Sequence, residues 1–319
     1  MKLLRLLALG LLVVTGLAWG QTYPDKAKPI RIILPQGPGS ASDVLTRAFA
    51  RAITETSGLV TVIDFKPGAE TVIGVQALMN SPADGYSMLL VSSSTPVLNP
   101  VMIANLPYDP LRDFIPLLGL SKASLAFNLG ISTQFKSARE FIAAAKANPG
   151  KYTFASSTTT TRLAGELLQS LAGIKLLNVP YKTTAAGATA LASGEVDLML
   201  ADPSSVRSLY ESGRVRPLAV SGPTRLTSMP NLPTLREEGV ADYDVTAWFA
   251  TYFAVKTPPE VVATMRDILR KAVKAPSFTE ALAAASMEPL DLAGDSISAL
   301  IRKETEMWTK VARDANLRP

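Results

Sequence analysis

The sequence of 319 residues contains neither cysteine nor histidine. The absence of cysteine excludes disulfide bonds and thiolate nucleophiles, and the absence of histidine excludes imidazole bases. Ser-His and Cys-His catalytic pairs are therefore excluded, together with nearly all zinc and iron sites. Carboxylate and lysine catalysis remain available. These absences favour a binding protein over an enzyme, and we expect no metal and no cofactor.

Clustered positive charge is also missing. The chain has 32 basic and 27 acidic residues, a net charge of +5. Without Lys2 and Arg5, which lie in the segment discussed next, 30 basic residues stand against 27 acidic ones, a net charge of +3. The basic residues occur singly among acids, whereas nucleic-acid-binding proteins normally present a clustered basic face. We therefore expect no nucleic-acid partner.

The N-terminus contains an apolar run, but a short one. Basic Lys2 and Arg5 precede an apolar stretch from Leu6 to Val14, and small residues end at Gly20. This pattern predicts a signal peptide over residues 1–20, cleaved near Gly20. A membrane anchor is the alternative, but the stretch is short for a membrane span and no basic flank follows it. Since no cysteine follows, a lipoprotein anchor is excluded.

The remaining 300 or so residues fit two lobes better than a single core. Apolar runs typical of strands alternate with helical patterns, which predicts an α/β fold with parallel sheets and helices on both faces. Three further helical patterns follow Pro258-Pro259, and we expect them to pack back on the first lobe. Strands are expected at Ile30 to Leu34, Val60 to Phe65, Ser87 to Val91, Tyr152 to Ala155, Leu176 to Val179, Leu198 to Leu200 and Val215 to Val220, and helices at Val44 to Thr56, Val72 to Asn80, Ala138 to Asn148, Leu163 to Ala172, Ala185 to Ala192, Glu260 to Lys274, Phe278 to Ala285 and Ile297 to Ala315.

Ligands of such folds bind at the carboxyl ends of the strands, so the loops that follow strands are the candidate sites. The first is the turn Pro35-Gln36-Gly37-Pro38-Gly39-Ser40-Ala41-Ser42-Asp43. Its glycines allow close approach of an anion to backbone N–H groups, and Ser40, Ser42 and Asp43 are helix-capping residues. The turn therefore predicts a carboxylate or phosphate site. A capped turn without a ligand is the alternative. Gly37-Pro38-Gly39 also matches the start of a dinucleotide-binding motif, but Ser42 stands where that motif has its third glycine, so the match is partial.

A second polar loop consists of six consecutive hydroxyl residues followed by Arg162. Hydroxyl donors, the N-terminus of a helix and a guanidinium group together suit a carboxylate. The alternatives are a solvated surface loop and a surface ion pair between Arg162 and Glu166. The hydroxyl residues are Ser156, Ser157, Thr158, Thr159, Thr160 and Thr161.

Two further loops are polar, at Ser92 to Thr95 and at Tyr181 to Thr184. Lys182 offers a point charge to a ligand there, or is a solvated turn residue. Asp197 and Asp202 bracket a predicted strand, and we interpret them as capping and turn residues, since no third ligand completes a metal site. The aromatic cluster at Trp248, Phe249, Tyr252 and Phe253 is typical of a core, although Trp248 could close one end of a cleft.

The order of short motifs along the chain resembles the Bug family, the substrate-binding proteins of tripartite tricarboxylate transporters. The resemblance covers nearly all of the chain after residue 20. Its motifs are Pro35 to Asp43, Lys66-Pro67-Gly68-Ala69, Pro82-Ala83-Asp84-Gly85-Tyr86, Asn99-Pro100, Leu106-Pro107-Tyr108-Asp109-Pro110, Asp113-Phe114, Val179-Pro180-Tyr181-Lys182, Gly194-Glu195-Val196-Asp197, Leu218-Ala219-Val220, Pro233-Thr234 and Trp248-Phe249.

The resemblance implies a periplasmic solute receptor that resembles type II periplasmic binding proteins and closes two lobes on a small carboxylate. We expect lobe 1 at residues 21–122 and 223–319, lobe 2 at 123–222, and a monomer that delivers its ligand to inner-membrane transporter subunits. The resemblance implies that the ligand contacts both lobes. The predicted ligand-binding residues are Gln36, Gly37, Pro38, Gly39, Ser40, Asp43, Ser94, Thr95, Ser156, Ser157, Thr158, Thr159, Thr160, Thr161, Arg162, Tyr181, Lys182, Thr183 and Asp202.

The chain departs from the family pattern inside these loops. Gln36 stands where an aromatic is usual, and Ser40 and Thr183 where glycine is usual. Arg162 stands where the family has a histidine or a small polar residue, and Glu70-Thr71 replace a pair of glycines. Arg162 favours a dicarboxylate, and Gln36 leaves room for an aromatic acid. An exported enzyme that uses a nucleotide or a carboxylate, and a periplasmic sensor that feeds a two-component kinase, are the alternatives.

Overall fold

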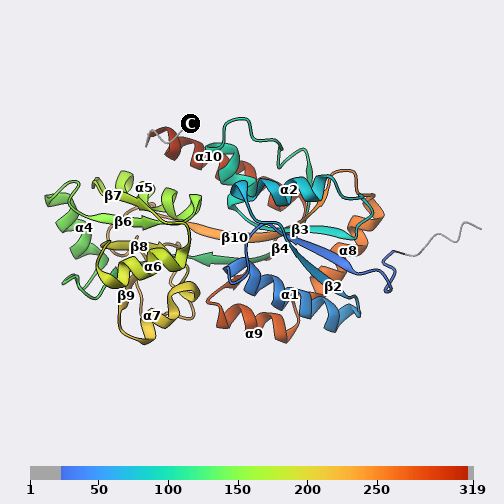
Figure 1. The fold of residues 1–319 in the computed structure, drawn as a ribbon, viewed down its shortest axis with the longest axis horizontal. Coiled ribbons are helices and arrows are strands. Elements are labelled where there is room, and N and C mark those ends of the chain that lie inside the picture. Colours follow the sequence, from blue (N-terminus) through green and yellow to red (C-terminus); the bar gives the residue numbers. More distant parts are fainter. Residues whose placement is uncertain (1–22, 315–319) are drawn as a thin grey trace, which may run out of the picture.

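The computed structural model describes residues 23–314, which form two mixed β-sheets lying side by side, each flanked by helices (Figure 1). The predicted signal peptide, residues 1–20, lies outside the described residues. We call each sheet with the helices packed on it a lobe. The α/β class is as predicted, and the lobe boundaries at 122/123 and 222/223 stay predictions.

The sheet of the first lobe has six strands in the order β11-β4-β10-β3-β1-β2. β1 pairs in parallel with β2 and β3, whereas β10 and β11 pair in antiparallel fashion with their neighbours. The strands are β1 (Ile30–Leu34), β2 (Thr61–Phe65), β3 (Ser87–Ser92), β4 (Phe114–Ser124), β10 (Thr246–Ala254) and β11 (Glu288–Pro289).

The sheet of the second lobe has five strands in the order β7-β6-β8-β5-β9. β6 is parallel to β7 and β8, and β5 is antiparallel to β8 and β9. The prediction of purely parallel sheets is therefore wrong, because β4, β5 and β10 gave no strand signal in the sequence. The strands are β5 (Ala126–Gly130), β6 (Thr153–Ser156), β7 (Leu177–Pro180), β8 (Leu198–Ala201) and β9 (Val215–Val220).

Helices cover both faces of the first sheet because side chains alternate along β1. Ile32 belongs to the hydrophobic core under α1, α8 and α9, whereas Ile33 belongs to the core on the opposite face, under α2 and α10. The predicted return of the C-terminal helices to the first lobe is confirmed, and α10 also contacts α5 of the second lobe. The helices of this lobe are α1 (Ala41–Ser57), α2 (Val72–Met79), α3 (Asn99–Met102), α8 (Pro259–Ala272), α9 (Pro276–Ala284) and α10 (Asp295–Asp314), with short turns η1 (Ala69–Thr71) and η2 (Ser94–Leu98).

The second lobe has α5 and α6 packed on its sheet. One core contains Phe127, Phe141 and Phe154, and a smaller one lies around Leu191 under α6. The first of these cores is continuous with residues of the first lobe such as Val97, so apolar contacts cross between the lobes. The helices are α4 (Ala138–Ala147), α5 (Thr159–Ala172), α6 (Thr184–Ser193) and α7 (Arg207–Glu211), with the turn η3 (Pro203–Val206).

The chain passes between the sheets twice, from β4 to β5 and from β9 to β10. Ser221 joins the two passages, because its Oγ accepts a hydrogen bond from Leu125 N at 2.7 Å and donates one to Val245 O at 2.5 Å. Backbone hydrogen bonds link the same segments, from Ser221 N to Leu125 O and from Val245 N to Ser221 O. The predicted core position of the aromatic cluster is confirmed, since Trp248 is 2% exposed on β10.

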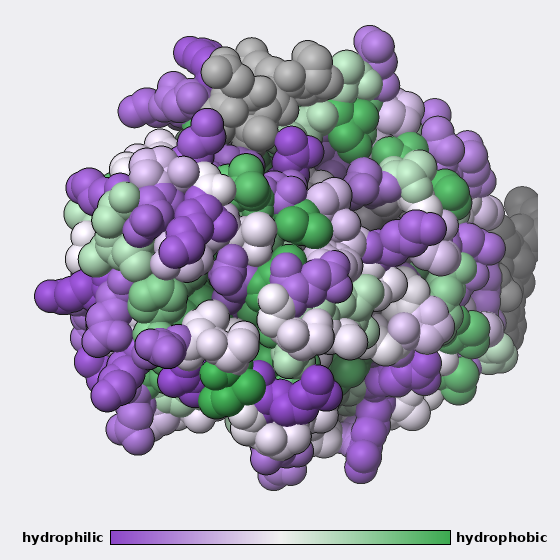
Figure 2. Space-filling model, turned by 60° about the vertical axis from the view of Figure 1, so that its left-hand side comes forward, coloured by the Kyte–Doolittle hydropathy of each residue, from purple (hydrophilic) through white to green (hydrophobic). Residues whose placement is uncertain are grey.

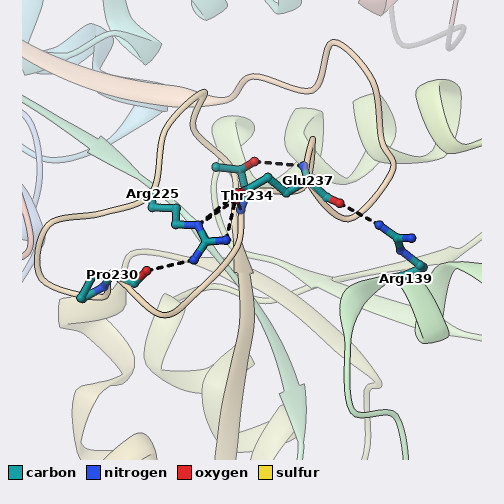
Figure 3. Close-up of polar contacts among 5 residues, drawn as sticks. All are labelled: Arg139, Arg225, Pro230, Thr234 and Glu237. Atoms are coloured by element: carbon teal, nitrogen blue, oxygen red, sulfur yellow. Dashed lines mark hydrogen bonds and ion pairs between the residues drawn. The ribbon is translucent and has the colours of Figure 1, made fainter.

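The long connection between β9 and β10 is held by its own polar contacts (Figure 3). Arg225 pairs with Glu237 at 2.9 Å and also donates a hydrogen bond to Pro230 O at 3.2 Å. Glu237 accepts from Thr234 N at 2.7 Å, and Arg139 of α4 donates to Glu237 O at 2.8 Å. The connection is therefore tied to the second lobe.

The face shown in Figure 2 is mostly hydrophilic, with apolar residues in small groups. No helix within residues 23–314 combines the length and apolar character that a membrane span requires. The same residues contain no cluster of three acidic side chains that could hold a metal ion.

Candidate ligand-binding cleft

The loop between β1 and α1 is closed by its own side chains. Ser40 is the N-cap of α1 and accepts a hydrogen bond from Asp43 N at 3.2 Å. The Asp43 carboxylate accepts from Gly39 N at 2.9 Å and lies 2.8 Å from Arg47 Nε. Gly39 has a φ of +80°, a left-handed conformation that favours glycine. The predicted helix cap is confirmed for Ser40, whereas no cap hydrogen bond of the Ser42 side chain is found among the described residues. Asp43 is buried within the loop, with Gly39 and Arg47 as its partners.

Gln36 has a different environment from the capping residues of this loop. Its Oε1 is buried and has no hydrogen-bond partner among residues 23–314. A buried amide oxygen without a partner costs free energy, of the order of 1–3 kcal/mol. Asp43 Oδ1 also lacks a hydrogen bond but forms the ion pair with Arg47, whereas Gln36 Oε1 has neither kind of partner among these residues.

The hydroxyl loop of the second lobe is partly helical, which corrects its prediction as a loop. Ser156 ends β6, and α5 begins at Thr159 rather than near Leu163. Thr158 and Thr161 form a capping box in which each side chain accepts a hydrogen bond from the backbone of the other. These two hydroxyls satisfy N–H groups that the start of a helix otherwise leaves free. The helix therefore starts where the hydroxyls cap it, before its apolar pattern begins.

A cavity of about 500 Å³ lies between this helix start and the first lobe. Six predicted ligand-binding residues line it together with Glu70 and Met102 of the first lobe. Its volume lies within the usual range for small-molecule sites, about 300 to 1,000 Å³. The six are Ser156, Ser157, Thr158, Thr159, Arg162 and Tyr181, and the lining is completed by Asn178 and Pro180.

Contacts within the cavity wall orient its polar groups. Ser156 Oγ donates a hydrogen bond to Asn178 Oδ1 at 2.8 Å, and Ser157 Oγ lies 3.0 Å from Thr184 Oγ1. Thr159 Oγ1 donates to Glu70 Oε2 at 3.3 Å, so this hydrogen bond crosses from one lobe to the other. The cavity is therefore a cleft between the lobes rather than a pocket within one of them.

Arg162 is exposed at this cleft. Its guanidinium forms no ion pair within 4.0 Å and no side-chain hydrogen bond among residues 23–314, so the expected alternative of a pair with Glu166 is not found there. Glu166 instead accepts a hydrogen bond from Gln169 Nε2 at 2.7 Å. Burial raises the pKa of the Glu166 carboxyl, while the charge of Arg162 opposes this change. Arg162 is thus available to an anion in the cleft.

The loop after β3 supports the cleft from within the first lobe. Thr95 is buried, and its Oγ1 lies 2.9 Å from Thr71 Oγ1. Ser94 Oγ lies 2.8 Å from Ser92 Oγ. Asn99 Nδ2 donates to Thr71 Oγ1 at 3.2 Å and to Tyr108 Oη at 3.0 Å. Thr95 therefore contacts the segment around Thr71 and does not line the cavity.

The remaining predicted residues of the second lobe lie at strand ends near the cleft. The Tyr181 hydroxyl donates to Glu195 Oε1 at 2.8 Å, and burial together with this carboxylate raises the pKa of Tyr181 to about 12. Thr183 is the N-cap of α6 and accepts from Ala186 N at 3.1 Å. Lys182 is exposed. Thr183 thus has a capping role that explains the absence of glycine there.

The two aspartates that bracket β8 have different roles. The Asp197 carboxylate accepts from Thr153 N at 2.8 Å and from Thr153 Oγ1 at 3.0 Å, which ties β6 to the turn before β8. Asp202 precedes η3, but its side chain makes no cap hydrogen bond, so the predicted capping role of its side chain is wrong. Burial raises the pKa of the Asp202 carboxyl.

The structure therefore brings together part of the predicted site. It adds Glu70, Met102, Asn178 and Pro180. Of these, Glu70 had a signal in the sequence, because it replaces a glycine of the family pattern. The predicted residues that do not line the 500 Å³ cavity are Gln36, Gly37, Pro38, Gly39, Ser40, Asp43, Ser94, Thr95, Thr160, Thr161, Lys182, Thr183 and Asp202.

A wider groove of about 1130 Å³ lies elsewhere, between α10 and the segment from Pro100 to Leu111. None of the predicted ligand-binding residues lines this groove. Its lining includes Ile103, Leu111 and Met307, and all of its lining residues belong to the first lobe. The groove is therefore not part of the cleft between the lobes.

Two sheet-based lobes around a polar cleft define a solute-binding protein with the periplasmic binding protein fold, and solved structures agree. The chain is 27% identical to "R. palustris Rpa4515 with adipate", with a TM-score of 0.84 over 92% of this chain and 98% of that one. It is 25% identical to the periplasmic binding protein BugD, with a TM-score of 0.81 over 93% of this chain and 100% of that one. The fold predicted from the sequence is thereby confirmed.

The chain belongs to the TctC family of tripartite tricarboxylate transporter receptors, whose model matches residues 45–317. It is 31% identical to protein BugT of Bordetella pertussis, and the match covers 98% of this chain and 98% of that protein. The predicted resemblance to the Bug family is confirmed. The protein is a binding protein of a transporter family and not an enzyme, so the alternative of an exported enzyme is wrong.

Proposed function

We propose that this protein captures a small carboxylate, foremost a dicarboxylate, between its lobes in the periplasm and delivers it to inner-membrane transporter subunits. The observation that carries the proposal is the cavity that both lobes line, with the free guanidinium of Arg162 beside the hydroxyls at the start of α5. A guanidinium can donate two parallel hydrogen bonds to a carboxylate, and the N-terminus of a helix favours negative charge.

The chemistry of the cleft suits a carboxylate more than a neutral ligand. Of the described residues that line the cavity, Arg162 is the only basic one, and Thr158 and Thr159 lie one turn or less before it. The structural relative Rpa4515, whose structure contains adipate, supports a linear dicarboxylate as the first ligand to test.

Calorimetric titration with adipate, hexanoate and benzoate tests the proposal. All three acids carry one carboxylate. Comparison of adipate with hexanoate shows the effect of a second carboxylate, and comparison of benzoate with hexanoate shows the effect of an aromatic ring. We expect adipate to bind most tightly, and Arg162→Ala to weaken adipate at least tenfold, because one charge-assisted pair contributes about 1.5–3 kcal/mol. Lys175→Ala, which removes an exposed basic residue outside the cavity, is the matched control. An unchanged adipate affinity in Arg162→Ala would contradict a dicarboxylate contact at Arg162.

A further inference from the structure

Glu70 brings a carboxylate of the protein itself into the cleft. It is the only acidic residue among the described residues that line the cavity. Its Oε2 accepts the hydrogen bond from Thr159 Oγ1 at 3.3 Å, and Thr159 is the first residue of α5. Glu70 and Arg162 therefore present opposite charges to the same cavity from opposite lobes.

The backbone around Glu70 holds this side chain at the cleft. Ala69, Glu70 and Thr71 have φ values of 46°, 49° and 75°, which are left-handed and unfavourable for residues other than glycine. Asn99 offsets part of this cost, because its Nδ2 donates to Glu70 O at 2.6 Å and to Thr71 Oγ1 at 3.2 Å. Asn99 is itself buried. A buried network thus fixes the segment, so that Glu70 projects from a defined position rather than from a mobile loop.

The groups that face Glu70 are the ones that a second ligand carboxylate would use. Thr159 contributes a hydroxyl donor. The N–H of Thr161 is capped by Thr158 Oγ1, so the N–H groups of Thr159 and Thr160 are the ones at the start of α5 without an acceptor in the helix or its capping box. A carboxylate near these groups is stabilised by the helix dipole. The carboxylate of Glu70 and a carboxylate of the ligand would therefore compete for the same donors, and two like charges at one place repel each other.

We propose that Glu70 is a specificity-determining residue that occupies, in the ligand-free receptor, the place of a ligand's second carboxylate. The proposal rests on the proposed function, since it concerns the same cleft. A dicarboxylate must displace Glu70 from Thr159 in order to bind, whereas a monocarboxylate can leave this contact in place. Glu70 thus lowers the affinity for dicarboxylates relative to monocarboxylates and sets how strongly the receptor distinguishes them.

Titration of adipate and hexanoate into Glu70→Gln tests the competition. These acids have six carbons each and differ in the second carboxylate, and the substitution removes the charge with little change in size. We expect the variant to bind adipate about tenfold more tightly, a gain of about 1.4 kcal/mol, with hexanoate changed less than twofold. Glu280→Gln, which removes an exposed charge on α9, is the matched control. Weaker adipate binding, or equal changes for both acids, would overturn the proposal.

A second measurement needs no ligand and separates this proposal from the proposed function. Because the chain lacks cysteine, Lys146→Cys on α4 and Lys271→Cys on α8 allow two spin labels, one on each lobe. Figure 1 shows these two helices on opposite sides of the molecule. We expect Glu70→Ala to shift the distance distribution between the labels, since a contact between the lobes is lost, and Glu280→Ala to leave it unchanged. An unchanged distribution in Glu70→Ala would overturn the contact. If the wild type binds neither adipate nor hexanoate, the proposed function fails, and the distances still decide whether Glu70 forms the contact between the lobes.

Discussion

The indole Nε1 of Trp248 donates a hydrogen bond to Glu304 Oε2 at 2.8 Å. Trp248 lies on β10, the strand by which the chain returns to the first lobe, and Glu304 lies on α10. Burial raises the pKa of the Glu304 carboxyl to about 7, and the nearby charge of Asp244 acts in the same direction. The bond therefore links the returning strand to the C-terminal helix through a group that titrates near neutral pH.

This titration predicts a loss of stability as the pH rises. The pKa of Glu304 is about 7 in the folded protein and near the ordinary value of a glutamate, 4.5, in the unfolded chain. Protonation therefore stabilises the fold fully below about pH 4.5, and this contribution is lost as the pH rises towards 7. We expect Glu304→Gln, which keeps an acceptor for Trp248, to gain stability relative to the wild type between pH 5 and 7.5 in urea unfolding. Glu306→Gln, at an exposed neighbouring position, should show the same pH dependence of the unfolding free energy as the wild type. If the unfolding free energies of Glu304→Gln and the wild type change in parallel with pH, the titration does not belong to Glu304.

Gly165 allows α5 to pack closely on β6. A Cβ atom at this position would lie 2.2 Å from Cε2 of Phe154, a fully buried ring. We expect Gly165→Ala to reduce the free energy of unfolding by about 1–3 kcal/mol, because overpacking forces buried groups to move. Gly37→Ala is the control, since no atom lies within 4 Å of its Cβ and its φ is not positive. A loss below 0.5 kcal/mol in Gly165→Ala would show that Phe154 moves without cost.

Asn99 stabilises the left-handed segment at the edge of the cleft. We expect Asn99→Ala to destabilise the protein by about 1–3 kcal/mol, because it leaves Glu70 O and Tyr108 Oη without a buried hydrogen-bond donor. It should also increase amide hydrogen exchange in residues 69–71. Asn80→Ala, at the exposed end of α2, is the matched control. Unchanged exchange in 69–71 would show that other contacts hold the segment.

The parts of the fold in which a strand is followed by a helix could be predicted from the sequence. β1 and α1 follow directly from the apolar run at Ile30 and from the capping residue Ser40. β4, β5 and β10 were missed because they are buried on both faces, so that their side chains do not alternate between apolar and polar. β10, for example, contains seven buried residues in a row, from Ala247 to Phe253. Their antiparallel pairing depends on long-range contacts that no local pattern records.

The candidate site was predictable to the extent that polar residues follow strand ends. Thr158 and Arg162 were placed at the cleft by this rule, and both line the cavity. Ser40, Asp43 and Thr183 have the same polar character, but their side chains complete turns and helix caps. Sequence alone does not separate these two uses, since a hydroxyl or carboxylate at the start of a helix can serve either the helix or a ligand.

The hydroxyl of Ser221 determines how motion can pass through the molecule. Because it bonds to Leu125 of one passage and to Val245 of the other, neither passage can twist alone without straining the other. The two passages are thus tied into one hinge segment. A rotation of one lobe against the other has to move both passages together, so the two rims of the cleft change their spacing in concert.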